Sequence, residues 1–326
     1  MSHSLPSGMQ EGRGGNVSIQ GDIASIGECM VEMAPAADGL YRQGFAGDTL
    51  NTAWYLRALT SADKRAVRYV SAVGTDALSE RMVDFLTGNG IDASHLARIA
   101  QRTVGLYLIT LAGAERSFTY WRKDAAARLL ANDLPRLEAA LAGVGLVYFS
   151  GITLAILEPA DRARLFQALA GLRQRGCEVV FDPNIRPRLW PDAATMAAAT
   201  IDGYRAASIA LPTFPDEAAL YGDRSLRDTA DRIAALGVRE IVVKNGADPA
   251  LVRAPGVDDF VPVAPSGQPV DTTGAGDSFN GGYLAGRIAD RSPVAAAELG
   301  HKVAARVICV RGALADMPSL ADLRVE

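Results

Sequence analysis

The sequence predicts an α/β fold in which a mostly parallel central sheet is covered by helices on both faces. Beyond residue 140, short apolar runs alternate several times with segments of helical spacing, which is the pattern of repeated strand and helix units. Apolar residues make up 49% of the chain and charged residues 21%, so a large core is available. Before this region, near residue 110, two runs of alternating apolar and polar residues depart from the strand and helix order and predict a small inserted sheet.

Length, charge and cysteine spacing narrow the class of protein. A chain of 326 residues could form two average domains, but one large α/β domain agrees with the length equally well. The formal net charge is −4 at pH 7 and no basic block is present, so nucleic acid is not expected as a partner. Cys29, Cys177 and Cys309 lie far apart without metal-binding spacing, and we expect buried thiols and no structural zinc.

The first part of the chain begins with a leader rich in glycine and polar residues. We expect residues 1–21 to be disordered and to contribute nothing to function, and residues 22–326 to form the folded domain. Alternating and apolar runs then predict strands at Ile23 to Met33, Leu40 to Phe45 and Ala66 to Val73, with helices around residues 53–59 and 76–89.

A β-hairpin is predicted next. Its strands are Arg102 to Leu111 and Arg116 to Arg122, separated by a short segment that contains Gly113. Because a hairpin is foreign to a chain of alternating strands and helices, we interpret residues 37–46 and 101–123 as insertions. Together they would form a small sheet that acts as a lid.

The strand and helix units resume after the hairpin. Ligands of parallel sheets bind at the carboxyl ends of the strands, so the loops that follow these strands are the candidate site. The expected strands are Leu146 to Phe149, Glu178 to Phe181, Ala207 to Leu211 and Glu240 to Lys244, with two short ones near Leu251 and Val261; the expected helices are Pro159 to Arg175, Asp192 to Tyr204, Asp216 to Tyr221, Ser225 to Leu236, Ala275 to Ile288 and Pro293 to Val310.

One segment has the length of a membrane span. Residues 139–157 carry no charge, but glycine, serine and threonine break the segment into pieces, so a buried strand that leaves a helix end explains it better. The first twenty residues lack the apolar region of a signal peptide. We therefore expect a cytoplasmic protein with no membrane partner. His95 and His301 belong to no ligand cluster and are expected to be ordinary surface or partly buried residues.

The most informative stretch is Val270 to Gly282. Its threonines and glycines suit a tight turn, and the residues that follow have helical spacing, so unpaired N–H groups of a helix start would converge on one spot and could bind a phosphate. Asp277 would repel that phosphate unless it takes a proton from an attacking hydroxyl. The alternative is structural, because the helix dipole alone favours an aspartate in a first turn.

The run DTTGAGDSFNGGYLAG resembles the C-terminal signature of the ribokinase-like (PfkB) family of sugar and nucleoside kinases. The resemblance implies a ribokinase-like fold, a catalytic base at Asp277 and an anion hole at Gly274, Ala275 and Gly276, with Asp271 among the substrate-binding residues. The chain contains no Gly-Lys pair and no G-x-G-x-x-G at this place, so neither a Walker-type NTPase nor a dinucleotide oxidoreductase is supported.

A second motif lies at residues 46–51. It resembles the family's glycine pair followed by an asparagine, which implies that Gly47, Asp48 and Asn51 bind sugar hydroxyls. Ala46 stands where the family has the first glycine. Taken alone, Gly-Asp-Thr is also an ordinary turn with a helix cap.

Aromatic residues mark the hairpin. Tyr120 to Asp124 and Gly47 to Asn51 resemble 2-keto-3-deoxygluconate kinases within this family, which implies that Tyr107, Tyr120 and Arg122 bind a sugar acid. Cross-strand packing is the alternative for the tyrosines.

Arg186 follows a predicted buried strand and would reach the same cleft. A guanidinium can hold a carboxylate by two parallel hydrogen bonds, and neutral sugars give no reason for two arginines, so Arg122 and Arg186 together favour a sugar acid. The alternative for Arg186 is a solvated loop residue between two turn-forming prolines. By resemblance, Asn184, Lys244, Gly246 and Asn280 lie near the nucleotide.

Magnesium is expected with ATP, because it offsets phosphate charge in kinases. The family often carries Asn-x-x-Glu near this ion; here Glu217 is in place, and the asparagine is replaced by Phe214. Glu217 is therefore expected to act on magnesium indirectly, through water. A monovalent cation is a further cofactor that the sequence leaves open.

Together with these observations, the resemblance implies an ATP-dependent kinase that phosphorylates 2-keto-3-deoxygluconate on its primary 6-hydroxyl to give 2-keto-3-deoxy-6-phosphogluconate. The alternatives are a neutral-sugar kinase of the same family, such as a fructokinase or a ribokinase, and a non-catalytic protein that senses sugar or nucleotide. The open edge of the small sheet also predicts a homodimer formed through the lid.

Overall fold

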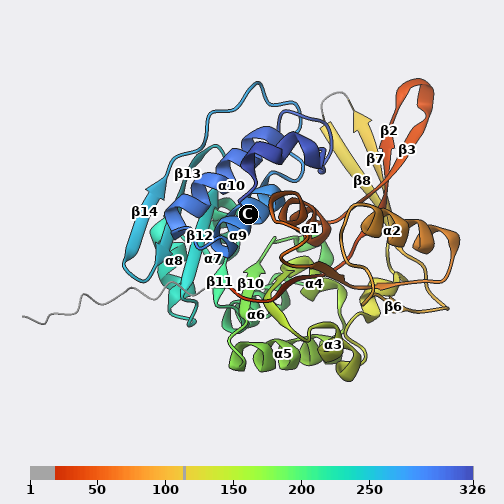
Figure 1. The fold of residues 1–326 in the computed structure, drawn as a ribbon, viewed down its shortest axis with the longest axis horizontal. Helices are drawn as coiled ribbons and strands as arrows, with labels where there is room; N and C mark the ends of the chain where they lie inside the picture. Colours follow the sequence, from red (N-terminus) through yellow and green to blue (C-terminus); the bar gives the residue numbers. More distant parts are fainter. Residues whose placement is uncertain (1–18, 113–114, 326) are drawn as a thin grey trace, which may run out of the picture.

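The computed structural model describes residues 19–112 and 115–325, and the predicted leader lies almost entirely outside them. The main feature is an eight-stranded sheet in the middle of the molecule (Figure 1). In spatial order its strands are β14 (Val257–Val261), β13 (Asp248–Ala254), β12 (Glu240–Asn245), β11 (Ile209–Ala210), β10 (Glu178–Asp182), β9 (Val144–Ser150), β1 (Asp22–Ile26) and β4 (Val67–Val70).

Neighbouring strands from β4 to β12 are parallel, whereas β13 and β14 extend the sheet in antiparallel pairs. Parallel neighbours require crossovers, and the helices between them cover both faces of the sheet. The predicted class, with a mainly parallel sheet between two layers of helices, is confirmed.

Successive side chains of the buried strands point into two separate cores, as strand geometry requires. On β9, Leu146 and Tyr148 enter one core, while Val147 and Phe149 enter the other. The first core packs against α1 (Asp48–Leu59), α2 (Ala77–Gly88), α9 (Ala275–Ile288) and α10 (Pro293–Val307), and the second against α3 (Leu134–Ala140), α4 (Gly151–Ile156), α5 (Pro159–Gln174), α6 (Ala193–Ala206), α7 (Phe214–Tyr221) and α8 (Leu226–Ala234).

A second, four-stranded sheet projects from the body of the molecule (Figure 1). It contains the predicted hairpin and the predicted strand near residue 40, so the expectation of a small separate sheet is confirmed. Its strands are, in order, β3 (Tyr41–Ala46), β2 (Met30–Pro35), β7 (Gly105–Ala112) and β8 (Glu115–Trp121).

The prediction of one strand from Ile23 to Met33 was wrong. The chain forms β1 in the central sheet, leaves it at Gly27 and begins β2 in the small sheet. Gly27 lets the chain pass close to α1 at this point, because a Cβ there would lie 2.4 Å from Oγ1 of Thr49. Hydrophobicity alone hides the break, since both strands are apolar.

Other differences are local. The strand expected at Ala66 to Val73 is split, because its end forms β5 (Ala72–Val73), which pairs with β6 (Ala97–Arg98). The uncharged segment of residues 139–157 contains β9 followed by α4, and within the described ranges no helix is long and apolar enough to cross a membrane. Four short 3-10 turns complete the elements: η1 (Ala37–Gly39), η2 (Ala126–Leu129), η3 (Pro187–Leu189) and η4 (Met317–Leu323).

Candidate functional site

The amino end of α9 forms one wall of a cleft. Gly274 precedes the helix with φ of 76°, and a Cβ there would lie 2.8 Å from the carbonyl oxygen of Ala313, so glycine is required on both counts. The N–H of Ala275 donates to the carbonyl of Thr272 at 3.2 Å. The N–H groups of Gly276 and Asp277 follow in the first turn, where a helix offers no carbonyl partner. They are the donors that remain for an anion.

Asp277 faces the cleft from this first turn. Its Oδ2 accepts a hydrogen bond from Nδ2 of Asn51 at 2.8 Å, and Thr52 donates to its main-chain carbonyl at 3.3 Å. Desolvation and the nearby charge of Asp48 raise the pKa of Asp277 to about 7, although the Asn51 bond works in the opposite direction. A carboxylate with this pKa can hold and release a proton near neutral pH.

The helices that carry Asp277 and Asn51 are in close contact. A Cβ at Gly281 would lie 2.5 Å from Cβ of Tyr55, so α9 and α1 approach each other at a glycine. The hydroxyl of Tyr55 donates to the carbonyl of Ala313 at 2.6 Å. This packing fixes the distance between the helices that carry Asp277 and Asn51, and so places these two side chains within hydrogen-bond distance.

The carboxyl ends of β10 and β12 supply a charged network behind Asp277. Nζ of Lys244 lies 2.8 Å from Oδ2 of Asp182 and 3.0 Å from Oδ1 of Asn280. Nδ2 of Asn280 donates to the same Asp182 oxygen at 2.6 Å and to the hydroxyl of Tyr148 at 3.2 Å. Asn280 is fully buried, so it holds Lys244 and Asp182 from inside the protein.

The start of α1 forms the facing wall. Oδ2 of Asp48 accepts from Nδ2 of Asn184 at 2.9 Å, and burial raises the pKa of Asp48. Gly47 is in extended backbone, and a Cβ there would lie 2.2 Å from the carbonyl oxygen of Glu28, so only glycine permits this approach. The motif predicted at residues 46–51 is therefore part of the cleft.

These walls enclose a cavity of about 600 Å³. The sequence-predicted residues that line it come from the body of the molecule and from the small sheet. They are Gly47, Asp48, Asn51, Tyr107, Tyr120, Asn184, Arg186, Lys244, Gly246, Gly274, Ala275, Gly276 and Asp277.

An adjoining cavity of about 370 Å³ lies beneath the small sheet. Arg122 lines it at the end of β8, and Arg186 and Arg188 line it from the loop after β10. Arg186 and Tyr120 border both cavities, so the two spaces adjoin. The structure thus brings the two predicted arginines to one place.

The predicted tyrosines lie on neighbouring strands. The ring centroids of Tyr107 and Tyr120 are 5.9 Å apart, and the hydroxyl of Tyr107 donates to Oε2 of Glu32. Tyr107 is buried, whereas half of Tyr120 is exposed toward the cleft. Cross-strand packing and a place in the cleft are both present.

Besides the buried Asn280, two other predicted residues are held away from the cleft. Glu217 is fully buried and accepts from the hydroxyl of Tyr204 at 2.7 Å and from Nη2 of Arg232 at 2.6 Å. Asp271 is buried and accepts from the backbone N–H groups of Thr273 and Gly312. In this conformation Glu217 belongs to an internal ion-pair network, and Asp271 organises the loop before α9.

Other residues line the cleft that sequence reasoning did not single out. Asp216, next to Glu217, lines the cleft; burial raises its pKa, and the charge of Arg186 opposes this shift. His301 is only 6% exposed, so the prediction of a surface or partly buried histidine was wrong. Its Nε2 has no hydrogen-bond partner in the part of the chain that the structure describes, and burial lowers its pKa.

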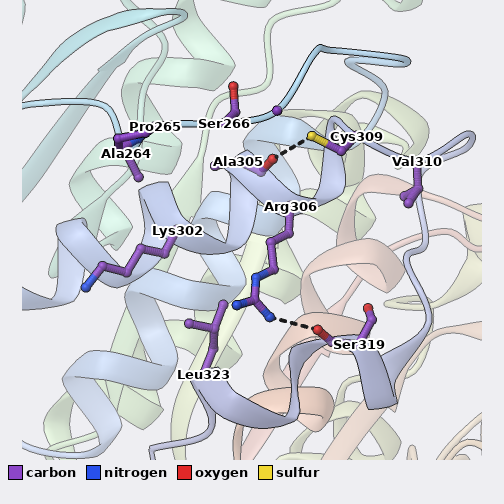
Figure 2. Close-up of a pocket in the computed structure, with 11 residues that line it drawn as sticks. Ala264, Pro265, Ser266, Lys302, Ala305, Arg306, Cys309, Val310, Ser319 and Leu323 are labelled. Carbon is purple, nitrogen blue, oxygen red and sulfur yellow. Dashed lines mark hydrogen bonds between the residues drawn. The ribbon is translucent and has the colours of Figure 1, made fainter.

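A separate cavity of about 600 Å³ lies between α10, the loop at residues 264–267 and η4 (Figure 2). Arg306 crosses it and donates to the carbonyl of Ser319 at 2.8 Å, and the same guanidinium is bound by the carboxylate of Asp322. The thiol of Cys309 donates to the carbonyl of Ala305. These groups are engaged within the fold, and the candidate chemistry lies in the cleft at Asp277.

Comparisons with known proteins identify the family of the chain. Residues 20–320 match the pfkB family of carbohydrate kinases. The chain is 38% identical over 309 residues to 2-dehydro-3-deoxygluconokinase of Haemophilus influenzae, covering 93% of this chain and 98% of that protein. It is 41% identical over 298 residues to the Escherichia coli K12 protein of the same name, covering 90% and 96%.

Solved structures show the same fold. A PfkB protein from Polaromonas superposes with a TM-score of 0.80 at 25% identity, over 92% of this chain and 99% of that one. A putative Ribokinase II from Escherichia coli, solved with ATP and Mg²⁺, gives a TM-score of 0.80 at 21% identity over 93% and 98%. The chain belongs to the pfkB family of carbohydrate kinases.

Proposed function

We propose that this protein transfers the γ-phosphoryl group of ATP to the 6-hydroxyl of 2-keto-3-deoxygluconate, giving the 6-phosphate ester and ADP. The observation that carries the proposal is that two cavities adjoin and share lining residues. One contains Asp277 at a helix start, and the other contains Arg122 and Arg186. The names of the relatives at 38% and 41% identity support the same substrate.

Asp277 is the proposed base. As the 6-oxygen attacks the γ-phosphorus, its proton passes to the Asp277 carboxylate, the new O–P bond forms, and the bond to the bridging oxygen breaks so that ADP leaves. Asn51 holds Oδ2 of Asp277, which leaves Oδ1 to receive the proton. The first-turn N–H groups of Gly276 and Asp277 stabilise the charge on the transferred phosphoryl oxygens.

The donor set of the cleft suits magnesium. Asp48, Asp182, Asp216 and Asp277 line it against few cationic side chains, and a triphosphate alone would be repelled. Hard oxygen ligands are those that Mg²⁺ prefers, and the ion usually binds through one or two carboxylates plus phosphates. Asp216 is the carboxylate we propose to hold it, directly or through water, in place of the inward-facing Glu217. When bound, the ion neutralises phosphate charge.

The guanidiniums are the proposed receptors for the substrate carboxylate. A sugar acid reaching from Asp277 to Arg122 and Arg186 would present its 6-hydroxyl at one end and its acid group at the other. Closure of the small sheet as a lid would exclude water, which strengthens these ion pairs and prevents hydrolysis of ATP.

An ADP-release assay with a panel of sugars and sugar acids tests the proposal. We expect the highest kcat/KM for 2-keto-3-deoxygluconate. A higher kcat/KM for fructose or ribose would favour the neutral-sugar kinase, and the absence of turnover with every member of the panel would favour a sensing protein. The Asp277→Asn variant provides the background rate.

We also propose a homodimer formed through the lid. Leu40, Tyr41 and Trp121 are large apolar residues exposed on the small sheet, at 67%, 43% and 58%. Both β3 and β8 are edge strands, which tend to find partners. Light scattering at micromolar concentration should give the mass of two chains, and a pure monomer would contradict the proposal.

A further inference from the structure

All four chain crossings between the two sheets meet at one place. The chain enters the small sheet at Met30 and Gly105 and leaves it at Ala46 and Trp121, the ends of the four strands. Because β2 and β7 are parallel and β3 and β8 run antiparallel to them, these four strand ends lie at the same end of the small sheet. We call this end the base of the small sheet.

Glu28 lies at this base and contacts the crossings. It stands between β1 and β2, its main-chain carbonyl abuts Gly47, and its carboxylate binds Nη2 of Arg122, the residue after β8. A Cβ at Gly105 would lie 2.5 Å from Oε1 of Glu28, so the first residue of β7 leaves room for this carboxylate. Glu28 and Arg122 are 94 residues apart in the sequence.

The ion pair is strongly desolvated. The Glu28 side chain is 1% exposed and that of Arg122 is 13% exposed. Burial raises the pKa of Glu28, and the Arg122 charge opposes this shift. Oε1 of Glu28 is buried and has no hydrogen-bond partner within the described ranges. A buried carboxylate that is only half satisfied costs stability, which argues for a role beyond packing.

The geometry leaves part of Arg122 available. A guanidinium has five N–H donors. Within the described ranges, Nη2 is the one nitrogen of Arg122 that donates a hydrogen bond to Glu28. Arg122 also lines the 370 Å³ cavity, together with Arg186 and Arg188. Arginine has many rotamers, so a binding site gains when the protein orders the side chain before the ligand arrives.

We propose that Glu28 is a positioning residue that aims Arg122 at the carboxylate of the substrate and thereby sets the preference for acidic over neutral sugars. This inference rests on the proposed function. Glu28 itself does not touch the substrate carboxylate, which it would repel. It acts through Arg122, so its removal should matter only while Arg122 is present.

A double-mutant cycle tests this dependence. The variants are Glu28→Ala, Arg122→Ala and the double variant, with KM and kcat measured for 2-keto-3-deoxygluconate and ATP. Glu28→Ala should raise KM for the sugar acid about tenfold and leave kcat and KM for ATP within about threefold. The double variant should be no worse than Arg122→Ala. Glu28→Gln, which keeps an acceptor oxygen for Arg122, should restore KM to within about threefold of wild type.

Matched controls separate this role from loss of stability. Glu178→Ala removes the buried acid of the Glu178–Arg239 pair, whose N–O distance is 2.7 Å, at the opposite end of β10 from the cleft. It should lower Tm and leave both KM values unchanged. If Glu28→Ala does not fold, Glu28→Asp withdraws the carboxylate by one carbon, and Gly105→Ala displaces it by contact; both should raise KM for the sugar acid.

The outcomes distinguish the two levels of inference. If wild-type enzyme phosphorylates fructose but not the sugar acid, the proposed function and the role of Glu28 are both overturned. If it phosphorylates the sugar acid, the role of Glu28 alone is overturned by either of two results. One is an unchanged KM in Glu28→Ala or, where that variant does not fold, in Glu28→Asp and Gly105→Ala. The other is fully additive effects in the double variant.

Discussion

The two ends of the cleft are built in different ways. At the phosphate end, hydrogen bonds join Asp182 and Lys244 of the central sheet to Asn280 of α9, and Asp277 of α9 is bonded to Asn51 of α1. At the other end, Arg122 belongs to the small sheet and is held to the body through Glu28. The proposed reacting groups are fixed by the core. The groups proposed to choose the substrate are divided, because Arg122 directly follows a strand of the added sheet and Arg186 lies on the loop after β10.

This difference explains how one fold can serve many sugars. Catalysis requires placement within a fraction of an ångström, which packed helices and strands provide. Recognition of a distant acid group tolerates more movement and can be carried by a lid. Variants at the two ends should therefore change different kinetic constants.

Loss of the base should have the largest effect. Asp277→Asn removes the proton acceptor but keeps the shape of the side chain, so kcat should fall by about 10²–10⁴-fold with little change in KM. Steady-state kinetics with both substrates measures this. Near-normal turnover of the purified variant would refute the assignment of the base.

Loss of an arginine should change substrate affinity instead. Arg122→Ala and Arg186→Ala should each raise KM for the sugar acid by about 10–100-fold, because each removes charged hydrogen bonds. KM for fructose should change by less than about threefold. Arg205→Ala, an exposed arginine paired with Asp202, is the control. Equal effects on acidic and neutral sugars would contradict the division between the two ends.

The pH profile reports on the phosphate end alone. Because desolvation and Asp48 raise the pKa of Asp277 to about 7, the carboxyl is protonated below that pH and cannot accept a proton. We expect kcat/KM to fall about tenfold per pH unit below pH 7 and to level off above it. The residual rate of Asp277→Asn should lack this dependence. A profile flat down to about pH 5 would contradict the base.

The smallest effect should be on stability. The pKa of Asp277 is higher in the folded protein than in the unfolded chain. Ionisation of Asp277 therefore lowers the free energy of unfolding above pH 7, and this loss of stability disappears as the pH falls toward the pKa of the unfolded chain, near 4. Asp277→Asn removes the ionisable group and should raise Tm by a few degrees at pH 8 and hardly at all at pH 4. Thermal unfolding at both pH values measures this, and a lower Tm at pH 8 would contradict the direction of the shift.

Local patterns were sufficient for the fold class, and together with the family resemblance they selected residues that the structure brings into one cleft. The alternation of strands and helices requires a parallel sheet, and the turn before α9 is specific to one conformation. Gly274 shows why: its positive φ and its contact with Ala313 leave no other residue.

Tertiary contacts explain what the sequence did not predict. Glu28 follows an apolar strand and belongs to none of the motifs used in the sequence analysis, yet it binds Arg122, which lies 94 residues away in the sequence. Glu217 matched a family motif, but its side chain turns toward Arg232, and its neighbour Asp216 faces the cleft. A step of one residue along a helix turns the side-chain direction by about 100°, and spacing alone does not reveal which of two adjacent acids enters the site.

The close packing of α1 against α9 at Gly281 and Tyr55 has a consequence for how such a protein can evolve. Asp277, the proposed proton acceptor, and Asn51 are carried by two helices in close contact, so few mutations could shift one without the other. The crossings at Met30, Ala46, Gly105 and Trp121 lie outside this contact. Replacement of the segments between these crossings could change the substrate that the protein accepts, while the arrangement of Asp277 and Asn51 is kept.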